Sequence, residues 1–143
     1  FMPATGRSLV SYLPPGPLPP YVTIGADGIA RSVAGAVGEF LYGDCTPEDV
    51  AWAKARLVPQ NGAVVTTPVG PAAWQRIPST YLLLTEDLAV PVPLQRVFAA
   101  QAGRTIEMAA SHSPFMSKAP ALAGLLAGLA AAAAAPATVA VPV

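Results

Sequence analysis

Charge is scarce in this chain: eight basic and eight acidic residues make up only 11% of its 143 residues and balance to a net charge of zero. No block of one sign occurs, so the sequence lacks the basic stripe that nucleic-acid binding needs. The chain has one cysteine, Cys45, and one histidine, His112, which excludes an internal disulfide and a zinc site built from several cysteines. We therefore expect no nucleic-acid partner, no metal and no cofactor.

The first residues lack the pattern of a secretory leader, and Phe1 stands where a starting Met would be expected. We expect Phe1 to be an internal position of a larger polypeptide. Residues 119–135 form an apolar run, but it is mostly alanine and glycine and therefore too weakly hydrophobic for a comfortable membrane span. It predicts a packed helix instead, with no membrane partner, and we predict a cytoplasmic location.

A hydrophobic content of 53% is typical of a chain that folds around a core. Composition divides it into four parts. Residues 1–20 carry six prolines and predict a loop, and residues 21–78 form a lid with a hairpin near its start and a helix opened by Thr46-Pro47. Residues 79–135 alternate strand, helix, strand and helix, which predicts a parallel βαβ unit, and residues 136–143 form an uncharged tail.

Two short apolar segments each run into a titratable residue. Tyr81-Leu82-Leu83-Leu84 leads to Asp87, and Thr105-Ile106-Glu107-Met108 leads to His112, which lies 25 residues after that aspartate. Open parallel sheets place their sites at the carboxyl ends of strands, so we expect these two side chains to meet. A carboxylate that binds Nδ1 of an imidazole fixes its tautomer and stabilises its charged form, as a catalytic acid and base require.

Other interpretations remain open for each residue. Asp87 could be an ordinary loop carboxylate that caps the following helix, and a lone histidine is more often a surface residue than a catalyst. Glu86 and Glu107 are competing acids, but Glu86 should point away from Asp87 in an extended segment, and Glu107 fits an exposed or paired strand position. We prefer Asp87 as the acid.

Six segments in this order resemble the lid and carboxyl-terminal half of an alpha/beta hydrolase from the branch of esterases, hydroxynitrile lyases and plant-type methylesterases. The segments are Phe1-Met2-Pro3, Tyr42-Gly43-Asp44-Cys45, Thr66-Thr67-Pro68-Val69, Ile77-Pro78-Ser79-Thr80-Tyr81, Thr85-Glu86-Asp87-Leu88-Ala89-Val90-Pro91 and His112-Ser113-Pro114-Phe115-Met116-Ser117. The resemblance implies an α/β fold, with parallel strands, flanking helices and a mostly helical lid.

The same resemblance implies that Asp87 and His112 are the acid and base of a Ser-His-Asp triad. The usual glycine before the histidine is Ser111 here. The implied substrate is a small apolar ester or related carbonyl compound. Its pocket candidates are the aromatic residues Phe1, Tyr12, Trp52, Trp74 and Phe115, each of which could equally be an ordinary core residue.

The nucleophile is what the sequence does not supply. None of the seven serines lies in a G-x-S-x-G pattern, and Gly6-Arg7-Ser8-Leu9-Val10 lacks the final glycine. Cys45 before a predicted helix would keep the triad order, but it falls in the lid and is a low-probability nucleophile. We expect the serine on an amino-terminal half or a second chain, in a heteromer. The alternative is a noncatalytic remnant or partner subunit that binds a hydrophobic ligand or another enzyme chain.

Overall fold

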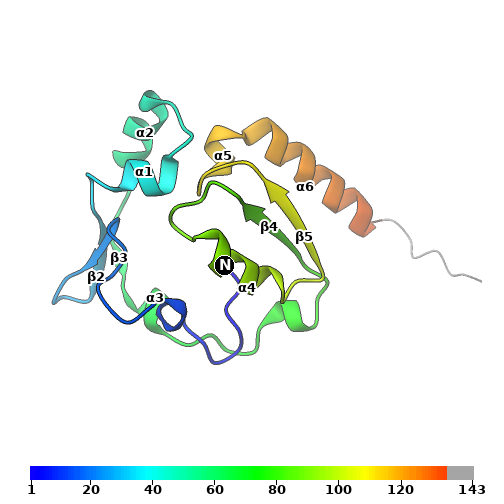
Figure 1. Cartoon of the computed structure of the whole chain (residues 1–143), viewed down its shortest axis with the longest axis horizontal. Helices are drawn as coiled ribbons and strands as arrows, with labels where there is room; N and C mark the ends of the chain where they lie inside the picture. The colour runs from blue at the N-terminus through cyan, green and yellow to red at the C-terminus, as the bar shows by residue number, and fades with distance from the viewer. Residues whose placement is uncertain (135–143) are drawn as a thin grey trace, which may run out of the picture.

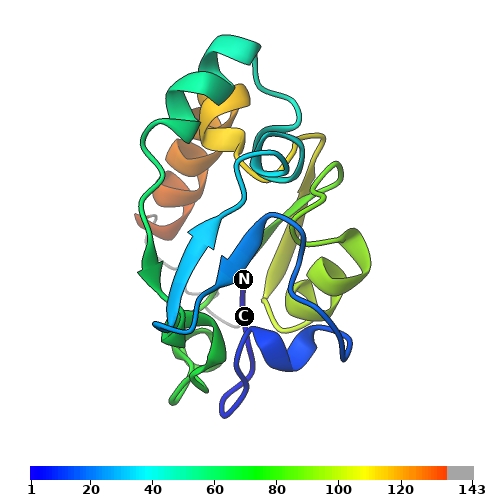
Figure 2. The same ribbon diagram turned by 90° about the vertical axis from the view of Figure 1, so that its left-hand side faces the viewer.

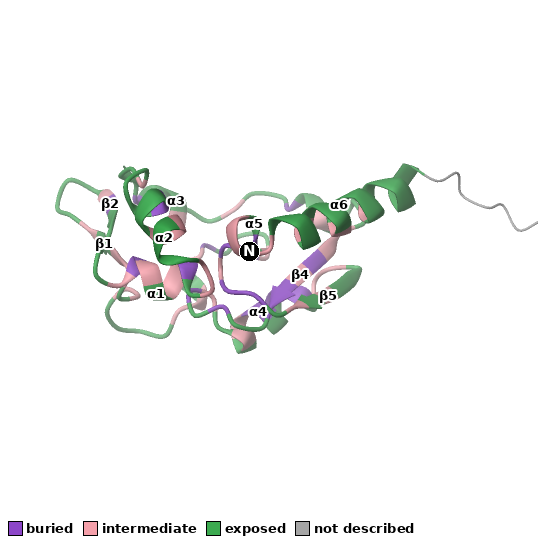
Figure 3. Cartoon of the chain, turned by 90° about the horizontal axis from the view of Figure 1, so that it is seen from above, coloured by how far each residue is buried: buried purple, intermediate pink, exposed green. Residues whose placement is uncertain are grey.

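A computed structural model describes residues 1–134. Its carboxyl-terminal half is built on a two-stranded parallel sheet of β4 (Thr80–Leu84) and β5 (Arg104–Met108), which pair Tyr81 with Thr105 and Leu84 with Met108. Helix α4 (Val92–Ala99) connects the strands and covers one face, while α6 (Ala119–Ala134) lies along the other (Figures 1 and 3). The predicted βαβ unit is therefore confirmed, and a helix follows it as predicted, but α6 has no buried residue, so its expected packing is not found in the described residues.

The core of this half forms where α4 packs on β4. Tyr81, Leu83, Phe98 and Ala99 are buried together, because alternate residues of the strand and one face of the helix point to the same side. The ring of Phe98 also meets the rings of Phe1 and Tyr12, with centroids 4.7 and 5.0 Å away. The first residues of the chain are thus packed on the βαβ unit, ahead of the short 3-10 helix η1 (Val10–Tyr12).

The lid combines a small sheet with three helices. Its antiparallel strands are β1 (Val22–Ile24), β2 (Ile29–Ser32) and β3 (Gln60–Asn61), in that spatial order. The predicted hairpin is β1–β2, which turns at Gly28 with a φ of 74° that favours glycine. The third strand was not predicted, because two residues leave no periodic pattern to read.

The lid helices are α1 (Val37–Tyr42), α2 (Pro47–Lys54) and α3 (Ala63–Thr66). Thr46 caps α2, where its hydroxyl accepts a hydrogen bond from the amide of Asp49 at 3.2 Å, as its position before proline predicts. Val37, Tyr42 and Ala53 form a second buried cluster between α1 and α2. A view turned by 90° shows these two helices beside α5 and α6 at one end of the molecule (Figure 2).

Three further elements complete the described part of the chain: η2 (Ala73–Gln75), which precedes β4, and α5 (Pro114–Ser117) and α6, which follow β5. Helix α6 carries no charged residue, yet most of it is exposed, including Leu126 at 55% (Figure 3). Within residues 1–134, no helix combines the length and the hydropathy that a membrane crossing would require. The predicted tail, residues 136–143, lies outside the described residues.

Candidate active site

Asp87 lies in the turn that follows β4, and its carboxylate is held on both oxygens. Oδ1 accepts hydrogen bonds from the amides of Ala89 at 2.8 Å and Val90 at 2.9 Å. Oδ2 lies 2.9 Å from Nδ1 of His112. The Asp87 side chain is only 3% exposed, so burial and three partners fix its orientation. The structure thus brings together the two residues that the sequence singled out.

The loops that carry these residues are joined by backbone pairing beyond the strands. The amide of Thr85 donates to the carbonyl of Met108 at 3.0 Å, and the amide of Glu86 donates to that of Ala110 at 3.1 Å. This pairing continues the parallel ladder past the strand ends and carries His112 to Asp87. Because Nδ1 faces the acid, Nε2 is the ring nitrogen left to exchange a proton, and the side chain is 38% exposed.

The negative charge of Asp87 contributes to raised pKa values of two tyrosines. Burial, with the nearby Asp87 carboxylate as a second cause, raises the pKa of Tyr81 to about 12. The same two causes raise the pKa of Tyr21. The Tyr21 hydroxyl donates to the carbonyl of Ala89 at 3.0 Å, so a lid residue supports the turn that holds the acid.

Gln95 is a supporting residue that the sequence analysis missed. Its side chain is buried on α4, where Oε1 accepts from the amide of Leu84 and Nε2 donates to the carbonyls of Leu84 and Val90, all at 2.8 Å. These bonds tie the end of β4 to the far side of the Asp87 turn. The signal that could have found it is a polar residue three positions before Phe98, on the apolar face of the predicted helix.

Asp87 and His112, which we call the dyad, line a cavity of about 280 Å³ beside β4. Its walls are mostly apolar, with Phe1, Met2, Thr80, Tyr81, Leu82, Leu84, Val90 and Gln95 around Asp87 and His112. Such a mixture of apolar walls and few polar groups is typical of small-molecule sites.

Of the five predicted pocket aromatics, only Phe1 lines this cavity. Tyr12 packs on Phe98, and Trp74 borders a separate hollow near Gln101. Trp52 on α2 and Phe115 on α5 are 55% and 63% exposed. In the described residues these four side chains are therefore not part of the wall around His112, because Tyr12 is used in the core, the lid residues Trp52 and Trp74 lie elsewhere, and Phe115 on α5 is exposed.

Cys45 is poorly placed for the role of nucleophile. It packs against the Val37 cluster and lines a different hollow, between α1 and α2. Burial, followed by the charges of Asp44 and Asp49, raises the pKa of the Cys45 thiol. A raised pKa reduces the thiolate fraction on which such chemistry depends. These observations argue against a self-contained cysteine hydrolase.

The competing carboxylates lie where the sequence analysis placed them. Glu86 is exposed, and Glu107 pairs with Arg96 at 3.3 Å on the outside of the helix–strand unit. Neither holds the imidazole, whose carboxylate partner is Asp87.

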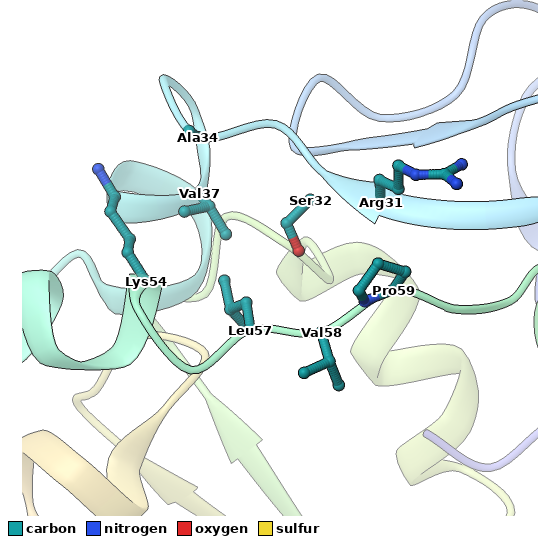
Figure 4. A pocket seen from close by; sticks show the side chains of 8 residues that line it. All are labelled: Arg31, Ser32, Ala34, Val37, Lys54, Leu57, Val58 and Pro59. Carbon is teal, nitrogen blue, oxygen red and sulfur yellow. The ribbon is translucent and has the colours of Figure 1, made fainter.

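A further cavity of about 210 Å³ lies in the lid, between the end of β2 and the segment after α2 (Figure 4). Val37 and Leu57 form part of its wall, and the Lys54 ammonium points away from it. Arg31 at its edge is paired with Asp27 at 2.7 Å. This cavity shares no lining residue with the one at His112.

Sequence comparison gives two findings. A family model described as "Alpha/beta hydrolase family" matches residues 2–125. The alpha/beta hydrolase nvfD of Aspergillus novofumigatus (strain IBT 16806) is 37% identical over 87 residues, which cover 59% of this chain and 35% of that protein. The chain therefore spans about a third of the length of this curated relative.

Solved structures share the fold. A pyrethroid hydrolase from Sphingobium faniae JZ-2 superposes with a TM-score of 0.76 at 21% identity, covering 92% of this chain and 58% of that one. The methylesterase MES16 from Arabidopsis gives a TM-score of 0.65 at 18% identity, covering 76% and 51%. The chain thus corresponds to somewhat more than half of each structure. Since the family match takes in the lid, both parallel strands and the histidine loop, this chain belongs to the alpha/beta hydrolase family.

Proposed function

We propose that this chain supplies the acid and base of a Ser-His-Asp triad in an esterase, with the serine on a part of the assembly outside these 143 residues. The observation that carries the proposal is the contact of 2.9 Å between Oδ2 of a buried Asp87 and Nδ1 of a half-exposed His112, at the mouth of an apolar cavity. Each feature is what the second and third members of such a triad require.

The proposed chemistry follows from the orientation of the imidazole. His112 Nε2 takes the proton of the serine hydroxyl as its oxygen attacks the ester carbonyl, and then gives that proton to the leaving alcohol. In the second half of the reaction it activates water in the same way. Asp87 holds the reactive tautomer and stabilises the imidazolium, while backbone amides of the remaining part of the assembly bind the oxyanion.

Two exposed surfaces support a partner that completes the sheet. Within residues 1–134, β4 pairs only with β5, so no strand covers its other edge, where Gln95 occupies the backbone groups of Leu84 alone. Helix α6 offers an uncharged surface whose residues are mostly exposed. We propose that the remaining strands of the hydrolase, from the same polypeptide or from a second chain, cover both.

The substrate we propose is a small, mostly apolar ester or related carbonyl compound. Phe1, Met2, Leu82 and Val90 give the cavity apolar walls, and its volume of about 280 Å³ suits a small molecule. The names of the structural neighbours, a pyrethroid hydrolase and a methylesterase, are in keeping with an ester.

Site-directed variants of the complete assembly test this proposal. His112→Ala and Asp87→Asn should each lower kcat for a short-chain p-nitrophenyl ester by about 10³–10⁴-fold, with Asp87→Asn acting by stabilising the wrong tautomer. The control is Glu107→Gln, an exposed carboxylate outside the cavity, which should leave kcat within about twofold. Full turnover in both dyad variants would instead favour the noncatalytic partner subunit.

A further inference from the structure

The loop that carries His112 is held by a second carboxylate, from the lid. Ser111 precedes the histidine and is only 3% exposed. Its hydroxyl donates a hydrogen bond to Oδ1 of Asp44, which lies 67 residues earlier in the chain, just after α1. Two neighbouring residues of this loop therefore bind carboxylates from two different parts of the fold. Ser111 binds Asp44 of the lid, and His112 binds Asp87 of the turn after β4.

Asp44 also lies near Lys118, which follows the histidine loop in the chain. Its second oxygen, Oδ2, is buried and lies 3.8 Å from the ammonium of Lys118, the residue before α6. Burial is the largest single influence and disfavours the charged carboxylate, but the hydrogen bonds to Asp44, led by that of Ser111, together outweigh it, and the pKa of Asp44 lies below its usual value. One charged side chain thus joins the residue before His112 to a residue six positions after it.

The position of Asp44 is itself fixed by its neighbours in the lid. The amide of Cys45 donates to the carbonyl of Tyr42 at 3.0 Å, and Tyr42 is buried in the cluster between α1 and α2. A Cβ on Gly43 would come within 2.9 Å of the Glu39 carbonyl of α1 and would lie 3.8 Å, an ordinary contact distance, from the Ser111 Cβ. The carboxylate is therefore presented from a turn that is anchored on α1 and lies directly beside the histidine loop.

We propose that Asp44 is a positioning residue for His112. It holds the histidine through Ser111 and thereby couples the packing of the lid to the position of the proposed base. The inference rests on the proposed function of His112 and adds a residue to which that function gives no role. Loss of the link would free the loop while leaving Asp87 in place. Because a displacement of about 1 Å can cost about a hundredfold in rate, the expected effect is on kcat.

Kinetics of four variants in the complete assembly test the link. Ser111→Ala and Asp44→Ala should each lower kcat for a short-chain p-nitrophenyl ester by about ten- to a hundredfold with KM within about twofold. The double variant should lose no more than Asp44→Ala alone, because that substitution already removes the contact with Ser111. Ser111→Thr, which keeps a hydroxyl, should recover most of the rate. Glu39→Gln, an exposed carboxylate on α1, is the matched control.

An NMR measurement tests the same link without turnover. The proton on Nδ1 of His112, identified as the signal lost in His112→Gln, should be protected from exchange by Asp87. It should exchange at least about tenfold faster in Ser111→Ala and Asp44→Ala than in Glu39→Gln. If these variants fail to fold, as a thermal melt would reveal, Lys118→Gln should still accelerate exchange through the second oxygen.

The outcomes separate this inference from the proposed function. Unchanged exchange in the folded variants, or losses of kcat that multiply in the double variant, would overturn the role of Asp44. Faster exchange in Ser111→Ala and Asp44→Ala would support it even if His112→Ala left hydrolysis intact, a result that overturns only the triad.

Discussion

At the residue scale, buried polar groups hold Asp87 and His112 in place. Asp87 accepts hydrogen bonds from two amides and contacts His112, and Gln95 binds three backbone groups, one of which, the buried amide of Leu84, has no other partner in the described residues. Leaving such groups unpaired is costly, because they lose water without gaining another partner. Stability and site geometry are therefore linked at this turn.

Replacing Gln95 with Leu should lower the free energy of unfolding by about 2 kcal/mol, since it leaves the buried amide of Leu84 without a partner and leaves the Leu84 carbonyl only the long bond of 3.4 Å from the Asp87 amide. Urea unfolding of the complete protein measures this loss. Gln75→Leu, at an exposed position, should change the stability by no more than about 0.5 kcal/mol. Equal effects of the two substitutions would contradict the role assigned to Gln95.

The raised pKa of Tyr81 leads to a prediction of how stability depends on pH. Its pKa of about 12 lies above the ordinary value of 10, so the folded state holds the phenol proton more tightly than the unfolded state. This contribution to stability is fully present below pH 10 and is lost as the pH rises from 10 towards 12. Absorbance titration should show a tyrosine that ionises near pH 12 and disappears in Tyr81→Phe. A spectrum unchanged by that substitution would contradict the assignment.

At the element scale, the sequence was sufficient where a regular pattern met a clear end signal. The apolar run Tyr81–Leu84 predicted β4 to within a residue, and the Thr46-Pro47 cap predicted where α2 begins. The meeting of Asp87 and His112 followed from the rule for parallel strand ends. Contacts between distant segments, such as Ser111 with Asp44, were not predictable because they depend on how the lid packs.

The Thr46 cap gives a prediction for α2. Thr46→Ala removes the acceptor for the Asp49 amide and should destabilise the protein by about 1 kcal/mol. Thermal or urea unfolding checks the change. Thr66→Ala, at the exposed end of α3, serves as the control and should have a smaller effect. The reverse order of the two losses would show that the cap is not what stabilises this helix.

At the scale of the whole molecule, the proposed partner surface includes the uncharged, mostly exposed helix α6. Leu126 on α6 and Val97 on α4 are 55% and 51% exposed, but only the former lies on an uncharged helix. Leu126→Glu should therefore weaken association with the remaining part of the hydrolase by at least tenfold, whereas Val97→Glu should not. Native mass spectrometry measures both. Equal association of both variants and the parent would contradict a partner surface on α6.

The most direct test of the central claim is covalent labelling of the complete assembly with a fluorophosphonate, followed by peptide mass spectrometry. We predict one labelled serine, in a G-x-S-x-G peptide outside these 143 residues, and labelling that slows by at least about a hundredfold in His112→Ala. An assembly without a labelled serine, or labelling that is indifferent to His112, would contradict the assignment of Asp87 and His112 as the acid and base of a serine hydrolase.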